Sequence, residues 1–148
     1  MRISSRAIIF KENKVLLNYR ERDNEKYYVF PGGKVEDNET KEKCIIRECK
    51  EELGININVK KYVYIVKGKE FIQHFFICDW VSGELGTGNS EEYETSRKGG
   101  IQIPMLIDIS KLKELNIVSP FIVRQLLGDI KNYGLELANE LKEIDERL

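Results

Sequence analysis

The most informative part of the chain is Gly33-Lys-Val-Glu-Asp-Asn-Glu39, which continues to Arg47-Glu48-Cys-Lys-Glu51-Glu52-Leu-Gly54-Ile55. The residues between and within these two segments suit a short helix, which we predict over Thr40 to Leu53. The glycine pair Gly32-Gly33 precedes this helix, and Gly54 follows it at the position where glycine commonly ends a helix. The stretch therefore predicts one helix with glycines before its start and after its end.

One face of the predicted helix is acidic. Each helical residue turns by about 100°, which places the carboxylates of Glu48, Glu51 and Glu52 within roughly 100° of one another. The neighbouring arc is apolar and is expected to be buried; it contains Ile45, Ile46, Cys49 and Leu53. Because like charges three and four residues apart repel each other, the acidic face is either a solvated surface or a ligand set for a hard divalent cation such as Mg²⁺.

The spacing of the whole stretch resembles the Nudix box. Five residues separate Gly33 from Glu39, and seven more separate Glu39 from Arg47-Glu48. The pair Glu51-Glu52 and then Gly54 complete the pattern, with apolar residues at positions 49 and 55. The residue at 49 is cysteine, which behaves as a small hydrophobic group and fits this position. The likeness to Nudix hydrolases extends, in our interpretation, over roughly residues 1–130.

The resemblance implies an α/β fold, with a mixed β-sheet sandwiched between α-helices. We expect a single Nudix domain over residues 1–131. Over residues 132–148, Leu137, Leu141, Ile144 and Leu148 recur at four-three-four spacing. This pattern predicts an amphipathic C-terminal helix. We expect the helix to pack on the domain or on a second copy of the chain in a homodimer.

Other elements are predicted from β-rich runs and turn residues. Two hairpins are expected, residues 3–10 with 15–19 and residues 55–68 with 70–81. Strands are expected at 27–30, before Pro31-Gly32-Gly33, and at 101–107. A capped helical turn is expected at 108–115. Ser119-Pro120 is typical of a helix start, and that helix is predicted to reach about Lys131.

Nudix enzymes hydrolyse a pyrophosphate that links a nucleoside to another group X, and the resemblance implies this activity here. Mg²⁺ ions, with Mn²⁺ as an alternative, would neutralise the diphosphate and lower the pKa of a bound water. By the resemblance, Glu51 and Glu52 bind the metal, and Glu48 binds the metal or acts near the base. The resemblance also implies that the carbonyl oxygen of Gly33 is a metal ligand.

Supporting roles are implied for the rest of the motif. Arg47 is expected to orient a carboxylate and to hold the loop before the helix by an ion pair, with Glu39 as its structural partner. In similar proteins, a carboxylate from a loop outside the box helps to hold a metal or serves as the base. The polar stretch 82–100 contains Glu84, Glu91, Glu92 and Glu94, of which we favour Glu94 and then Glu91 or Glu92. A solvated acidic loop explains these residues equally well.

The substrate is less defined. Arg20, Arg22 and Lys26 are candidates for contacting phosphates, although ordinary surface charges have an equal claim. The signals of the coenzyme A, ADP-ribose and NADH subgroups are not found, which leaves a (d)NTP or another small nucleotide as the expected substrate. Two alternatives are a non-catalytic Nudix-fold nucleotide-binding regulator and an RNA 5′-end pyrophosphohydrolase. The intact acid set disfavours the first, and a near-neutral charge disfavours the second.

Composition limits the remaining possibilities. A length of 148 residues suits one domain with one core. The net charge of −1 gives no sign of a broad surface for nucleic acid or membrane. No apolar run approaches the length of a membrane span, and the N-terminal residues lack the apolar stretch of a signal peptide. Cys44, Cys49 and Cys78 lack metal-type spacing and are expected to be reduced thiols in a cytoplasmic protein.

Overall fold

The computed structural model describes residues 1–86 and 100–147. In chain order its elements are β1 (Arg2–Ile8), β2 (Phe10–Lys11), β3 (Lys14–Arg22), β4 (Glu25–Val29), β5 (Gly32–Lys34), α1 (Lys41–Leu53), β6 (Ile55–Lys67), β7 (Phe71–Gly83), β8 (Ile101–Asp108), η2 (Ile109–Glu114), α2 (Pro120–Tyr133), η3 (Gly134–Glu136) and β9 (Lys142–Asp145).

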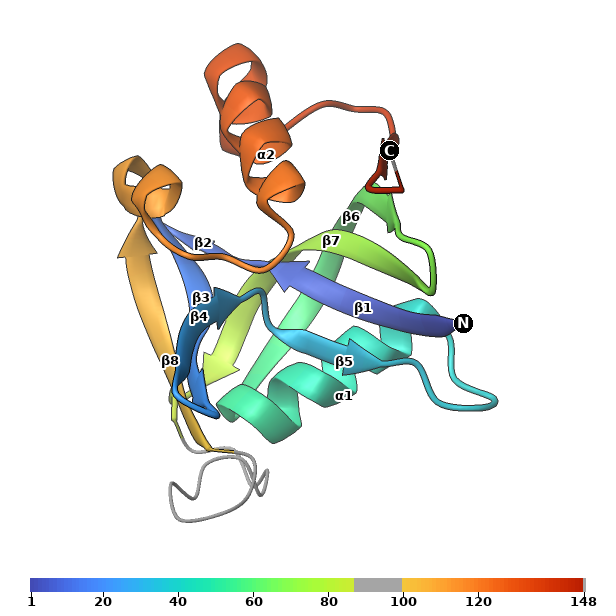
Figure 1. Ribbon diagram of the computed structural model, residues 1–148, viewed down its shortest axis with the longest axis vertical. Helices are drawn as coiled ribbons and strands as arrows, with labels where there is room; N and C mark the ends of the chain where they lie inside the picture. The colour runs from blue at the N-terminus through green and yellow to red at the C-terminus, as the bar shows by residue number, and fades with distance from the viewer. Residues whose placement is uncertain (87–99, 148) are drawn as a thin grey trace.

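The described strands form two sheets (Figure 1). The first joins β5, β1, β7, β6 and β9 in that order. Within it, β1 runs parallel to β7 and β6 runs parallel to β9, while β1–β5 and β6–β7 are antiparallel. In the second sheet β3 pairs with β2, β4 and β8, all antiparallel. The first sheet is therefore mixed, as predicted.

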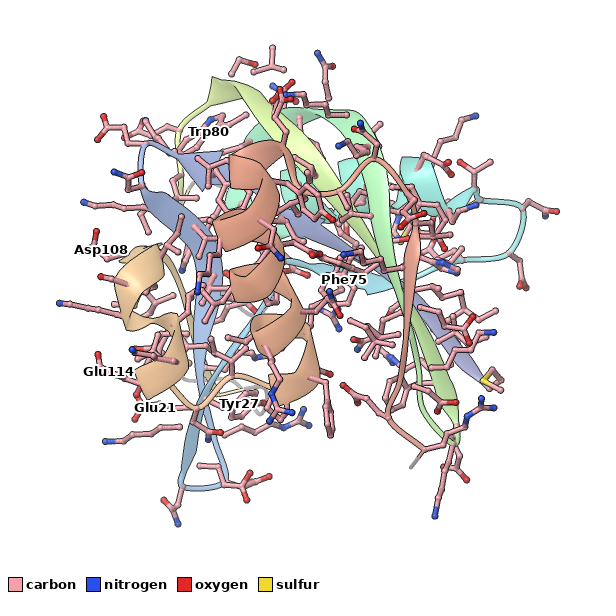
Figure 2. The ribbon with its side chains drawn as sticks, turned by 90° about the horizontal axis from the view of Figure 1, so that it is seen from above. Glu21, Tyr27, Phe75, Trp80, Asp108 and Glu114 are labelled. Atoms are coloured by element: carbon pink, nitrogen blue, oxygen red, sulfur yellow. The ribbon has the colours of Figure 1, made fainter. Side chains whose placement is uncertain are left out.

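The two α-helices cover opposite faces of the first sheet, as Figure 1 shows. Successive strand residues point to opposite faces, so neighbours in one strand enter different cores. Phe75 of β7 lies beneath α2 (Figure 2) and packs in a core that includes Ile122. Phe76 packs instead in the core on the side of α1, with Ile45. The predicted sandwich of a mixed sheet between helices is confirmed.

Helix α1 forms where the sequence predicts it. The Thr40 side chain caps its start by accepting a hydrogen bond of 3.1 Å from the Lys43 N–H. Gly54 ends it in the left-handed conformation, with φ of 77°. One detail of the expected apolar arc was wrong, because Ile46 is 43% exposed. Cys44 is buried in its place, since the β5 segment also covers the helix and extends the buried arc toward that residue.

The expected hairpin between residues 3–10 and 15–19 was wrong in its pairing. Only Phe10 and Lys11 pair with β3. Strand β1 instead lies between β5 and β7 in the other sheet. The physical reason is that both faces of β1 are buried at its C-terminal end, where Ala7 enters one core and Ile8 enters the other. A two-stranded hairpin would leave one of these faces exposed. The second expected hairpin is confirmed as β6 and β7.

The prediction of an amphipathic C-terminal helix was also wrong. Gly134 ends α2 as predicted, but the chain then forms η3 and the short strand β9, which pairs with β6. Leu137 adopts a positive φ of 62°, which interrupts a helix, and Leu141 stays 47% exposed. Pairing with β6 satisfies the backbone groups of an otherwise open sheet edge. This pairing places Ile144 against the core beneath α2.

The other elements agree with the sequence. The strands expected near 27–30 and at 101–107 are β4 and β8, and the turn expected at 108–115 is η2. Pro120 stands at the start of α2, although Ser119 makes no side-chain capping bond. Among the described residues, no helix is both long and apolar enough to cross a membrane.

Candidate active site

The acidic side chains of α1 differ in how far they reach solvent. Glu52 is buried, with 9% of its surface exposed. The Glu48 side chain is 15% exposed, and that of Glu51 is 47% exposed. All three stand on the helix face that borders β3 and β5, because Ile45, Cys49 and Leu53 turn the adjacent face into the core. The helix thus presents a graded set of carboxylates, from buried to open.

Arg47 connects these carboxylates to one another. Its Nη1 donates to Oε1 of Glu48 at 3.0 Å and to Oε2 of Glu51 at 3.2 Å. On its other side, Nε donates to Oε2 of Glu39 at 2.7 Å, and Nη2 donates to Oε1 of the same residue at 3.1 Å. The guanidinium therefore offsets the repulsion within the cluster and sets where two of its carboxylates point.

Glu39 ties this arrangement to the loop before α1. Its Oε1 also accepts a 3.0 Å hydrogen bond from the Glu36 N–H, which closes a tight turn. The hydrogen bonds from Arg47 lower the pKa of Glu39 to about 2. The same bonds to Glu39 raise the pKa of Arg47, so both groups stay charged near neutral pH. The expected ion pair between Arg47 and Glu39 is present.

Gly33 lies directly against Glu48. A Cβ atom at position 33 would stand only 2.5 Å from Cδ and Oε1 of Glu48. Only glycine therefore leaves room for this carboxylate. The Gly33 carbonyl oxygen faces Cys44, whose Sγ approaches it at 3.5 Å. Gly33 therefore contacts two residues of α1, Glu48 and Cys44.

Glu52 has a partner that the sequence did not suggest. Asn18 of β3, which is 1% exposed, donates from Nδ2 to Oε1 of Glu52 at 2.8 Å. Arg6 of β1 pairs with Gly32 of β5 and donates from Nη1 to the Phe30 carbonyl oxygen at 3.0 Å. Burial lowers the pKa of Arg6, and the charges of Glu52 and Glu48 act in the opposite direction. A signal for Asn18 did exist: it is an amide in the buried run Val15-Leu16-Leu17-Asn18.

The donor chemistry of this region fits a hard cation. It consists of carboxylate oxygens of Glu48, Glu51 and Glu52 and the carbonyl oxygen of Gly33, which are the ligand types that Mg²⁺ prefers. Over residues 1–86 and 100–147, no three acidic, histidine or cysteine side chains already stand in a coordinating arrangement. Arg47 and Asn18 donate hydrogen bonds to oxygens of this cluster, and the Glu51 side chain is 47% exposed.

Three of the four loop carboxylates that are candidates for holding the metal or serving as the base, Glu91, Glu92 and Glu94, lie outside the described residues. Glu84 is described and is exposed, just after β7. The cluster on α1 is therefore the part of the predicted ligand set whose geometry can be described.

A polar pocket opens where β1, β3 and β4 meet the segment before α2. It has a volume of about 510 Å³ and is lined by Arg6, Arg20, Glu25, Tyr27, Val29, Asn116 and Val118. Arg20 and Tyr27 face each other across β3 and β4, and Figure 2 shows Tyr27 toward the turn of that ribbon. The pocket and the acidic cluster are connected through β3, since Asn18 of this strand contacts Glu52 and Arg20, two residues further on, lines the pocket.

Of the three residues predicted to contact phosphates, one lines this pocket and two do not. Arg20 lines the pocket, whereas Arg22 is exposed at the end of β3 and is not among the lining residues. Lys26 is also exposed and lies 3.9 Å from Glu21. Arg6, which the sequence analysis did not select, takes a place beside Arg20.

Comparisons with known proteins agree with this geometry. A family model described as NUDIX domain matches residues 1–98. An ADP-ribose pyrophosphatase of Methanocaldococcus jannaschii is 37% identical over 90 residues, which cover 56% of this chain and 53% of the relative. An 8-oxo-dGTP diphosphatase of Proteus vulgaris is 39% identical over 59 residues, covering 38% and 53%. The chain thus spans about half the length of these curated relatives.

A solved structure extends the likeness of the fold beyond the matched segment. The crystal structure of a NUDIX hydrolase from Nitrosomonas europaea superposes with a TM-score of 0.74 at 16% identity. The match covers 98% of this chain and 79% of that one. At this identity the likeness concerns the fold alone, and it includes the C-terminal region that the family model does not reach.

Proposed function

This chain belongs to the Nudix family, and on that premise we propose that it is a Mg²⁺-dependent pyrophosphohydrolase acting on a small nucleotide. The observation that carries the proposal is the carboxylate cluster on α1, which is organised by Arg47 and is connected through Asn18 of β3 to the strand whose Arg20 lines a pocket with Arg6. Such a pair of sites suits a substrate with a crowded diphosphate at one end and a nucleoside at the other.

The cation would be held by Glu48, Glu51, Glu52 and the Gly33 carbonyl, with Glu94 as a further candidate. When bound, Mg²⁺ or Mn²⁺ supplies charge neutralisation for the diphosphate and helps to ionise the attacking water. In this proposal Glu48 either holds the cation or accepts a proton from the attacking water. Arg47 keeps Glu48 and Glu51 oriented and remains charged at neutral pH.

The pocket would bind the rest of the substrate. Arg6 and Arg20 provide guanidinium groups, which match phosphate oxygens. Tyr27 offers an aromatic ring, and Asn116 offers an amide, which suit a base. Arg22 is a weaker candidate than Arg20, because it lies at the exposed end of β3.

The favoured substrate class is a (d)NTP or another small nucleotide. The names of the two relatives cited above denote cleavage of ADP-ribose and of 8-oxo-dGTP, both of which contain phosphoanhydride bonds. ADP-ribose is therefore a second candidate, although the sequence signal of that subgroup is not found. A purely regulatory nucleotide-binding role is disfavoured, since binding alone does not require an Arg47-ordered set of carboxylates.

The direct test is a substrate panel. Purified protein with Mg²⁺ is offered canonical and 8-oxo (d)NTPs, ADP-ribose and a 5′-triphosphorylated RNA, and the products are separated by ion-exchange chromatography. We expect cleavage of at least one small nucleotide at a phosphoanhydride bond and none without a divalent cation. Binding without turnover of any member would support the regulatory alternative, and cleavage of the RNA alone would support the RNA-end alternative.

A further inference from the structure

Asn18 is a polar residue at a buried strand position, where an apolar side chain is usually found. It lies in the middle of β3, opposite Val29 of β4 and Pro104 of β8. Residues two apart share a sheet face, so Asn18 is on the face of Leu16, which packs in the core beside α1. A buried amide at such a position is unfavourable unless its polar atoms are satisfied. A reason other than packing is therefore needed for this residue.

Its amide orientation follows from its partner. An ionised carboxylate can only accept hydrogen bonds. The amide nitrogen must therefore be the atom 2.8 Å from Oε1 of Glu52, and the Asn18 oxygen must face elsewhere. That oxygen, Oδ1, is buried and has no hydrogen-bond partner in the described part of the protein. One half of the amide thus engages a candidate cation ligand, and the other half is left as a buried acceptor beside it.

We propose that Asn18 is a positioning residue that holds the Glu52 carboxylate through Oε1 in the orientation in which it would help to hold the cation, and that its own buried Oδ1 would accept a hydrogen bond from water at the site. This inference rests on the proposed function. Asn18 belongs to the sheet of β3, whereas Glu52 belongs to α1. The contact therefore couples the strand that carries Arg20 to the helix that carries the carboxylates.

A merely structural role would give a different pattern of effects. If Asn18 only joined the sheet to the helix, its replacement would lower thermal stability and leave cation affinity unchanged. Replacement by leucine removes a buried unsatisfied oxygen, but it also leaves Oε1 of the buried Glu52 carboxylate without its amide donor, so a lower melting temperature is expected in either case. The readout that distinguishes the two roles is cation affinity, which falls only if Asn18 positions Glu52.

The experiment measures Mn²⁺ affinity by titration calorimetry without substrate, in wild type, Asn18→Leu, Glu52→Gln and the double variant. Loss of a residue that orients a metal ligand typically weakens affinity by about 10–100-fold. We expect a loss in this range for Asn18→Leu in the wild-type background and less than about twofold further loss in Glu52→Gln, because Asn18 acts through Glu52. Steady-state kinetics should show a lower kcat with little change in the KM for the nucleotide.

The matched control is Asn56→Leu, which removes an exposed strand amide that donates to Ser82 at 2.9 Å and not to a carboxylate of α1; its Mn²⁺ affinity should equal that of wild type. Asn18→Ala is measured beside Asn18→Leu, so that a folding defect of either one does not decide the result. An unchanged Mn²⁺ affinity in the folded variants, with Glu52→Gln weakened, would overturn the role of Asn18 alone. Unchanged affinity in Glu52→Gln as well would overturn the proposed cation site too.

Discussion

Arg47 and Glu39 are joined by two hydrogen bonds, Nε to Oε2 at 2.7 Å and Nη2 to Oε1 at 3.1 Å. Two contacts fix the plane of the guanidinium, which a single contact would leave free to rotate. The remaining nitrogen, Nη1, is then directed at Glu48 and Glu51. The loop before α1 and the carboxylates on α1 are thus held as one unit, and the first two predictions concern this unit.

Replacing Arg47 by lysine should separate the loop from the helix. Lysine keeps the positive charge but offers a single ammonium, which cannot contact Glu39 and both carboxylates at once. We expect kcat to fall by about 10–100-fold and the melting temperature to drop. Arg147→Lys is the matched control, since Arg147 pairs with Asp145 on the exposed surface. Equal kcat values for the two variants would contradict the orienting role of Arg47.

Glu39 should contribute to stability in a defined pH range. Its folded-state pKa of about 2 lies below the ordinary value of 4.5. The contribution is therefore fully present above pH 4.5 and is lost as pH falls from 4.5 toward 2. Over this window the unfolding free energy of wild type, measured in urea, should fall more steeply than that of Glu39→Gln. Asp145 also has a lowered pKa, but it titrates in both proteins and cancels in the comparison. Parallel curves would refute the prediction.

Gly33→Ala should displace the Glu48 carboxylate without unfolding the protein. The new methyl group would stand 2.5 Å from Cδ of Glu48, so the carboxylate must move. A displacement of about 1 Å at a reacting centre can lower the rate by about 100-fold. Gly128→Ala in α2 is the control, because a Cβ there meets nothing within 4 Å. That change should leave kcat intact and stabilise the helix by about 0.5–1 kcal/mol. A Gly33→Ala enzyme with normal kcat would argue against the placement of Glu48.

The C-terminal strand should depend on one buried ion pair. Lys142 of β9 donates to Oδ1 of Asp129 at 2.7 Å, and Asp129 is 2% exposed. Lys142→Met leaves this buried carboxylate without its cation, which should lower the melting temperature by several degrees. Adding Asp129→Asn should recover part of the loss. Lys60→Met is the control, since its contact to Glu136 is exposed and 3.7 Å long. Equal effects of the two lysine changes would mean that the pair does not anchor β9.

The local features of the site could be predicted from sequence because they depend on spacing within one helix. The positions of Glu48, Glu51 and Glu52 follow from the helical period, and Thr40 and Gly54 mark its ends by their own chemistry. The contact of Arg47 with Glu39 was also expected, since the motif places both beside the same loop.

Features that depend on tertiary partners were not predictable in this way. The apolar residues after Gly134 do have helical spacing, but part of that segment forms β9, which pairs with the edge strand β6. The pairing of β1 is decided by the burial of its residues in two different cores and not by the turn that follows it in the sequence. Asn18 stands far from α1 in the sequence, and only the packing of two sheets brings it to Glu52.

The proposed hydrolysis depends on the carboxylates of α1 and a divalent cation. The decisive measurement is the rate of phosphate or pyrophosphate release from the best nucleotide substrate in Glu52→Gln, compared with wild type and Glu42→Gln. Glu42 is a matched control because it is an exposed carboxylate on the same helix. We predict a loss of at least about 100-fold for Glu52→Gln, larger than for an orienting residue, and a wild-type rate for Glu42→Gln. A Glu52→Gln enzyme as fast as wild type would mean that the carboxylate cluster of α1 is not the hydrolytic site.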